Sequence, residues 1–287
     1  MSQIGWHMIC NTYSRITRIL RNFDLFEFIN YGSDKIIILL LVIIRTSGLF
    51  IMAPVLSDQG IPKLIKIGLV VMFGLLITST IPNSAMFSEI TSNWQLAGLV
   101  FNEILIGFIL GLLFRLIFYG VLFAGSIVGY QIGFMFAQVF DQTNQTQVSI
   151  VGRFWYVLAL LFFICINGHH LIINGLVESF AVIPPGNFHM TGEVGEMMMK
   201  YSAYIFVIAF KIASPVIITL YLTDIALGTI AKTMPTMNVF FVGMPLKIAV
   251  GLVVMGLSLP MFTYVIEQSL QYFDTGMKTL LFTIGKA

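Results

Sequence analysis

Residues 96–140 decide the fold class: LAGLVFNEILIGFILGLLFRLIFYGVLFAGSIVGYQIGFMFAQVF. The only charged residues in this stretch are Glu103 and Arg115, and the polar run DQTNQTQ follows it at 141–147. An α-helix needs about 20 apolar residues to cross the roughly 30 Å hydrocarbon core of a bilayer. Because the stretch is much longer than one crossing requires, we expect the chain to bend, re-enter or leave the lipid here.

Composition extends this interpretation to the rest of the chain. Of its 287 residues, 58% are apolar and 10% are charged, against about 45–50% and about 25% in ordinary soluble domains. A mean hydropathy of +0.94 leaves too few polar residues to form a water-facing shell. The sequence therefore predicts an all-α, polytopic integral membrane protein. The net charge of +2 is small and the basic residues are scattered, which argues against nucleic-acid binding.

About six apolar runs approach the length of a membrane span. They are Ile36–Leu56, Leu64–Ile81, Leu96–Ala124, Phe154–Ile173, Ala203–Leu222 and Val239–Tyr264. We interpret residues 1–34 as a peripheral or loosely ordered leader, and residues 35–287 as the membrane domain.

Small residues recur at a spacing of four in two places, Gly107 with Gly111 and then Gly125, Gly129 and Gly133. Residues at this spacing share one helix face, so these strips allow close helix contact. Bulky side chains accompany the second strip: Tyr130, Phe134, Met135, Phe136 and Phe140. Residues 125–140 therefore fit either a hydrophobic constriction that excludes water or an ordinary close-packed helix pair.

Charged residues interrupt the apolar runs, namely Arg45, Glu103, Arg115, Lys211, Asp224 and Lys247. Each costs roughly 2.5–3.5 kcal/mol at a helix centre, so each needs a partner, a water-filled cavity or a route to the interface. We expect Arg45 to pair with Glu103, either as part of a proton or ion relay or as a structural contact between helices. Lys211 and Asp224 lie near the ends of one run and are expected to reach the interface.

The chain contains no P-loop, no HExxH, no GxSxG and no CxxC motif. His169 and His170 suggest an acyltransferase imidazole or a metal pair, but adjacent helical residues point about 100° apart and make poor joint ligands. Polar residues at a span end are the simpler interpretation. Cys10 and Cys165 are far apart in sequence and suggest no disulfide or redox role. We therefore expect a non-enzymatic protein without a cofactor or metal.

Two prolines divide the C-terminal third, since Pro235 and Pro245 flank the polar Asn238. Proline disrupts helical backbone bonding, so the pattern predicts a helical hairpin with a kinked second arm. A secondary transporter uses such broken helices to bind substrate, but no matching half of an inverted repeat is found in the chain.

The segment 224–252 closely resembles the signature of the FliR family of flagellar export components. The resemblance lies in Leu227-Gly228, in Met234-Pro235, in Met237 to Phe240, which includes Asn238, and in Gly243 to Lys247, which includes Pro245. Residues 45–48 and 103–111 resemble two further regions of that family. The sequence departs from the family pattern at Thr236 and Gln142, and its leader is longer.

The resemblance implies a subunit of the flagellar type III export gate, assembled with FliP-like, FliQ-like and FlhB-like subunits in the inner membrane at the flagellar basal body. Such a gate passes unfolded export substrates, and the region resembling residues 125–141 would close its pore. The alternatives are an injectisome subunit of the SctT type and, from another class, an ion-coupled secondary transporter.

Overall fold

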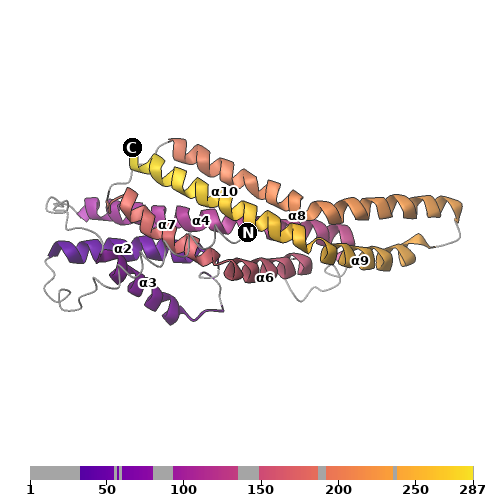
Figure 1. Ribbon diagram of the computed structural model, residues 1–287, viewed down its shortest axis with the longest axis horizontal. Coiled ribbons are helices and arrows are strands. Elements are labelled where there is room, and N and C mark those ends of the chain that lie inside the picture. Colours follow the sequence, from indigo (N-terminus) through magenta and orange to yellow (C-terminus); the bar gives the residue numbers. More distant parts are fainter. Residues whose placement is uncertain are drawn as a thin grey trace. The chain divides into compact units, whose positions relative to one another are not determined.

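The computed structural model describes residues 33–54, 57, 60–79, 93–134, 149–186, 192–234 and 238–286. All the regular structure in these ranges is helical, which confirms the predicted all-α membrane fold (Figure 1). The helices are α2 (Ser33–Met52), α3 (Lys63–Thr78), α4 (Asn93–Ile132), α6 (Ile150–Cys165), α7 (Gly168–Val182), α8 (Gly192–Thr233), α9 (Val239–Leu257) and α10 (Leu259–Lys286).

Two of the described helices, α4 and α8, are by themselves long and apolar enough to cross a membrane. Within the same ranges, up to four spans result if α6 with α7, and α9 with α10, each form one bent span. With 40 and 42 residues, α4 and α8 are each about 60 Å long, roughly twice the thickness of a bilayer core. The leader lies outside the described residues, apart from Ser33 and Asp34, which open α2.

The predicted run Phe154–Ile173 is not one helix. It is divided between α6 and α7 at Asn167, whose φ of 57° is left-handed. Asparagine adopts this conformation more readily than most residues because its short side chain can bond locally. The break is therefore a product of local backbone chemistry within a segment that hydropathy treats as continuous.

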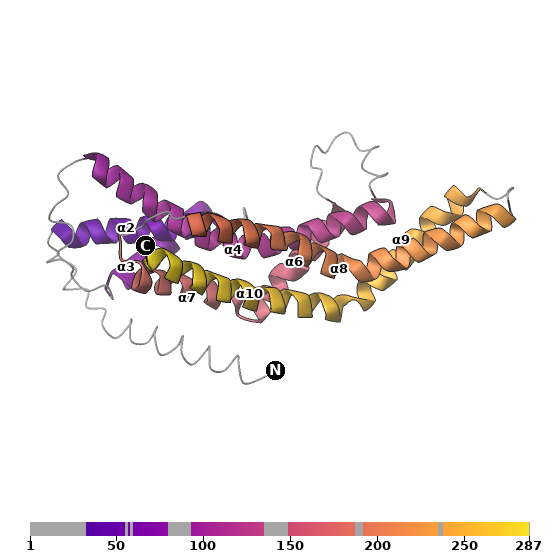
Figure 2. The ribbon, with the colours of Figure 1, turned by 90° about the horizontal axis from the view of Figure 1, so that it is seen from above.

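The run Val239–Tyr264 is likewise two helices, because α9 ends at Leu257 and α10 begins at Leu259. Pro260 lacks the backbone N–H that would continue the bonding of α9. The hairpin of α8 and α9 is present as predicted, and the two helices run side by side in both views (Figure 2). The bend in its second arm lies at Ser258, while Pro245 lies inside α9.

Helix α10 extends well beyond the predicted runs. It is amphipathic, with one buried apolar stripe at helical spacing. Averaging hydropathy over a window hides such a stripe, whereas its period of three to four residues reveals it. The stripe consists of Phe262, Val265, Ile266, Leu270, Phe273, Met277, Leu280, Leu281 and Ile284.

The chain forms two compact units. Unit 1 contains α2, α3, α7, the first part of α4 and the end of α10, within Met1–Arg115, Asn167–Met197 and Asp274–Ala287. Unit 2 contains the rest of α4, α6, most of α8, α9 and the first half of α10, within Leu116–Ile166 and Met198–Phe273.

Candidate functional site

The centre of unit 1 is an ion pair that is fully enclosed by protein. Arg45 of α2 donates from Nε to Glu103 Oε2 at 2.6 Å and from Nη2 to Glu103 Oε1 at 3.1 Å. Both side chains have 0% of their surface exposed. The two parallel bonds match the planar fork of a guanidinium to a carboxylate, which is the strongest geometry for such a pair. The structure thus brings together the two charges expected to pair.

Arg45 also binds the end of α7. Its Nη1 donates to the carbonyl oxygens of Ser179 and Ile183, each at 3.0 Å, and to Ser179 Oγ at 3.3 Å. The guanidinium carbon lies 4.2 Å from the centre of the Phe180 ring. The Ser179 carbonyl already accepts from the Ile183 N–H at 2.9 Å, so the arginine adds a second donor there. The Ile183 carbonyl lies just beyond the end of α7, where carbonyls lack a partner within the helix, and the arginine supplies one.

Glu103 fixes the segment that follows α7. Gly186 donates its backbone N–H to Glu103 Oε1 at 2.9 Å. One carboxylate therefore binds both the arginine and the turn at Pro184–Gly186. All three guanidinium nitrogens of Arg45 donate to fixed protein acceptors, which favours the structural interpretation of this pair over a proton relay.

The ion pair is located at a close contact between α2 and α4. A Cβ atom placed on Gly107 would lie 2.0 Å from the Arg45 carbonyl oxygen, and one on Gly111 would lie 2.7 Å from the Leu49 carbonyl oxygen. A Cβ on Gly48 would lie 2.8 Å from the Ile104 carbonyl oxygen. These backbones touch only because the glycines carry no side chain. Gly48 was missed as a packing residue, although it stands three positions after Arg45.

The second glycine strip packs within unit 2. A Cβ on Gly125 would lie 2.3 Å from Gly152 Cα, and one on Gly129 would lie 2.3 Å from Ser149 Oγ. Ser149 caps α6 and donates its hydroxyl to the Gly125 carbonyl at 3.1 Å. Up to Ile132 the glycine-rich segment is thus the last part of α4 rather than a separate element.

The expected pore-closing residues follow this contact. Tyr130 is 68% exposed on α4. Gly133 ends the helix with a left-handed φ of 97°, a value that favours glycine. Phe134 is half-buried. Met135, Phe136 and Phe140 lie outside the described residues.

The other charged residues of the apolar runs also have polar contacts. The Lys247 Nζ atom of α9 lies 2.5 Å from Asp224 Oδ1 of α8. The other carboxylate oxygen, Asp224 Oδ2, accepts a hydrogen bond from Gln131 Nε2 at 3.2 Å. Asp224 is therefore half of an ion pair, where the sequence suggested that it simply reaches the interface. Lys211 donates to Gln268 at 3.2 Å, and Arg115 to the Ile51 carbonyl at 3.4 Å.

The signature residues near the hairpin have distinct surroundings. A Cβ on Gly243 would lie 3.1 Å from Leu227 Cδ1, so this glycine allows α9 to approach α8 closely. Asn238 is exposed at the start of α9, and Pro245 lies inside it. Pro235 and the side chain of Phe240 lie outside the part of the chain that the structure describes.

The two adjacent histidines open α7 with their rings 4.4 Å apart. Throughout the described ranges, no group of three or more His, Cys, Asp or Glu residues gathers as a metal site. Cys165 is exposed at the end of α6.

These features define a polytopic helical membrane protein in which the buried Arg45–Glu103 ion pair and glycine contacts hold helices together. The chain belongs to the FliR family, because residues 36–273 match the family described as "Bacterial export proteins, family 1" and the relatives agree. FliR proteins are components of flagellar protein export, so this chain is a membrane-embedded flagellar export component.

Three relatives are each named flagellar biosynthetic protein FliR. The chain is 34% identical to that of Bacillus subtilis (strain 168) over 249 residues, which cover 86% of this chain and 95% of the relative. It is 31% identical to that of Escherichia coli (strain K12), covering 76% and 83%. It is also 31% identical to that of Pectobacterium carotovorum, covering 76% and 82%.

Proposed function

We propose that this chain is a non-enzymatic subunit of the flagellar type III export gate in the bacterial inner membrane. With FliP-like and FliQ-like subunits, and next to an FlhB-like subunit, it forms the conduit for unfolded flagellar proteins. The similarity to FliR proteins over most of their length carries this proposal. The energy for transport comes from other components of the apparatus.

The surface of the α8–α9 hairpin supports assembly with other helices. Large apolar side chains are exposed along both helices, and an apolar surface of this extent needs lipid or protein to cover it. Because α8 is longer than a bilayer crossing requires, lipid alone does not cover all of it. The exposed residues are Ile218, Tyr221, Leu222, Ile225, Ile230, Phe241, Val242, Leu246, Leu252, Val253 and Leu257.

Pore closure is assigned, within this proposal, to the end of α4 and the residues after it. Gly125 and Gly129 pack on the start of α6, and this contact anchors the segment that carries Tyr130 and Phe134. Bulky apolar side chains at a constriction exclude water and ions without any charge. We extend the same role to Met135, Phe136 and Phe140.

The testing experiment is a mild-detergent purification through a tag on this chain, followed by mass spectrometry. FliP-like and FliQ-like subunits in one large complex are the expected result. A lone monomer or homodimer would instead favour an ion-coupled transporter. A complex that supports virulence secretion but not motility would favour the injectisome alternative.

One substitution tests whether protein or lipid covers the α8–α9 hairpin. Gly228 of α8 is exposed, and a Cβ added there would meet no side chain or neighbouring helix of the described chain within 4 Å, so Gly228→Phe introduces its side chain at an open position. We expect this variant to lose its partners, because a neighbouring helix would meet the added ring. Gly192→Phe, at an equally open glycine that opens α8, is the matched control. Unchanged co-purification of partners with Gly228→Phe would contradict coverage by protein at this position.

A further inference from the structure

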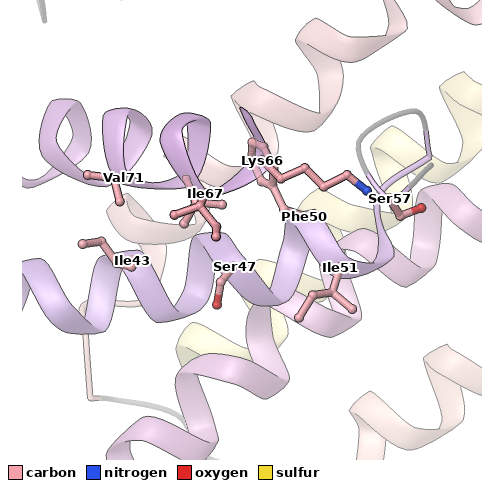
Figure 3. Close-up of a pocket in the computed structure, with 9 residues that line it drawn as sticks. Ile43, Ser47, Phe50, Ile51, Ser57, Lys66, Ile67 and Val71 are labelled. Carbon is pink, nitrogen blue, oxygen red and sulfur yellow. The ribbon is translucent and has the colours of Figure 1, made fainter. Parts of the chain in front are cut away.

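Unit 1 contains a groove between α2 and α3 that has no part in the proposed export role. The two helices run antiparallel and enclose a cavity of about 520 Å³, within the roughly 300–1,000 Å³ of sites that hold small ligands. Figure 3 shows α2 contributing Ile43, Ser47, Phe50 and Ile51, and α3 contributing Lys66, Ile67 and Val71.

The walls of the groove are apolar and continuous with the outer surface. Phe50 and Val70 are buried and form the floor, and the Phe50 ring packs against Phe73 at 6.0 Å. Ile51 and Ile67 form the rim and are 61% and 59% exposed. A groove with an apolar floor and an open apolar rim suits a flexible hydrocarbon chain that enters from the lipid.

The polar residues that line the groove are Ser47, Ser57 and Lys66, and the charged one lies at one end. Ser47, in the middle of the groove, donates its hydroxyl to the Ile44 carbonyl of its own helix at 2.7 Å, so that proton is already used. At the far end, Lys66 extends its amino group toward Ser57 (Figure 3). At the end opposite Lys66, Gly74 of α3 lies directly against Ile43 of α2, since a Cβ added to Gly74 would be 2.6 Å from Ile43 Cγ1. The groove is thus narrow and apolar at one end, and cationic at the other.

We propose that this groove binds an anionic phospholipid, with one acyl chain along α2 and α3 and the phosphate at Lys66. The ammonium complements the negative headgroup, and the apolar walls replace the lipid tails that would otherwise surround the acyl chain. A zwitterionic lipid fits the walls equally well but gains less from the lysine. The inference depends on the membrane fold and not on the export role.

The test is native mass spectrometry of the full chain after incubation with equal amounts of phosphatidylglycerol and phosphatidylcholine that carry identical acyl chains. The wild type is expected to retain the anionic lipid about five-fold better, the effect of one basic residue at a lipid headgroup. Lys66→Gln should abolish this preference, and Lys66→Arg should keep it. Val71→Trp fills the groove and should reduce retention of both lipids.

Lys63→Gln is the matched control, because Lys63 lies on the same first turn of α3 and does not line the groove. An equal loss with Lys63→Gln would show general surface attraction and overturn the proposal, as would equal retention of the two lipids by the wild type.

A photo-crosslinker at Ile67 identifies the occupant in cells. A lipid adduct supports the proposal, and a cross-link to another protein overturns it. None of these measurements depends on export.

Discussion

At the scale of single residues, the Arg45–Glu103 pair has the largest energetic consequences. Removing two ions from water costs several kcal/mol for each ion, and their attraction repays this only when the remaining donors and acceptors are also satisfied. Here the carbonyls at the end of α7 and the Gly186 N–H complete the arrangement. The pair therefore fixes the positions of three chain segments relative to one another.

Glu103→Gln should destabilise the protein strongly, because it leaves the Arg45 charge buried without a counter-charge. The expected loss is about 3–5 kcal/mol, seen as a lower melting temperature in detergent and a lower protein level in cells. Glu196→Gln, at an exposed carboxylate of α8, is the control and should behave like the wild type. Equal melting temperatures for the two variants would refute the buried-pair argument.

The double variant Arg45→Met with Glu103→Leu distinguishes a structural pair from a relay. Apolar residues of similar volume often replace a buried ion pair at little cost, so the double variant should recover part of the stability that Glu103→Gln loses. Motility should recover with it, because no titrating group is required. A stable double variant that remains non-motile, tested in a strain lacking the endogenous protein, would favour the proton relay.

At the scale of helices, glycines determine where the backbones touch. Gly107 and Gly111 place α4 against α2, and Gly125 and Gly129 place it against the start of α6. Close backbone contact of this kind replaces the hydrophobic driving force that is missing between helices in lipid.

Gly107→Ala should destabilise unit 1, because its Cβ would lie 2.0 Å from the Arg45 carbonyl oxygen and two backbones must separate. The expected cost is at least the roughly 1–3 kcal/mol of ordinary overpacking. Gly98→Ala is the control on the same helix, with no neighbour within 4 Å, and should be neutral or stabilising by up to about 1 kcal/mol. Scanning fluorimetry in detergent compares them. A Gly107→Ala variant that melts like Gly98→Ala would contradict the backbone contact.

The Asp224–Lys247 pair links α8 to α9 and is partly exposed, so screening by water reduces its energy to about 1 kcal/mol or less. Lys247→Glu should weaken the hairpin by placing two carboxylates together, and adding Asp224→Lys should restore it. The resistance of the hairpin to protease in detergent measures both the weakening by Lys247→Glu and its restoration by the exchanged pair. If the exchanged pair is no more resistant than Lys247→Glu alone, the side chains do not interact directly.

At the scale of the whole molecule, the proposed gate leads to a conduction experiment. Phe134 and Phe136, changed together to Ala, should allow small ions to leak through the purified complex in a planar bilayer, because shorter side chains admit water. Phe282→Ala, at an exposed aromatic residue of α10, is the control. Conductance that stays at the wild-type level would remove the gating role from this segment.

The candidate site was partly predictable. Arg45 and Glu103 stand out because each is a costly charge within an apolar run, and the spacing of Gly107 and Gly111 marks a contact face. The partners Ser179, Ile183 and Gly186 carry no such signal, because two backbone carbonyls and one backbone N–H make three of their four contacts and a single serine hydroxyl makes the fourth. Gly152 and Gly48 were missed because neither has a small residue four positions away on its own helix.

Hydropathy and local motifs, which depend only on neighbours along the chain, were enough to predict the helical membrane class, the family and most of the segments that become helices. Tertiary structure decided which charges pair, since Arg45 and Glu103 are brought together by the packing of α2 on α4. It also placed the ends of α7 and the groove beside α3, because these depend on contacts between residues far apart in sequence. The breaks at Asn167 and Ser258 lie between these two cases, as local chemistry permits each break while hydropathy hides it.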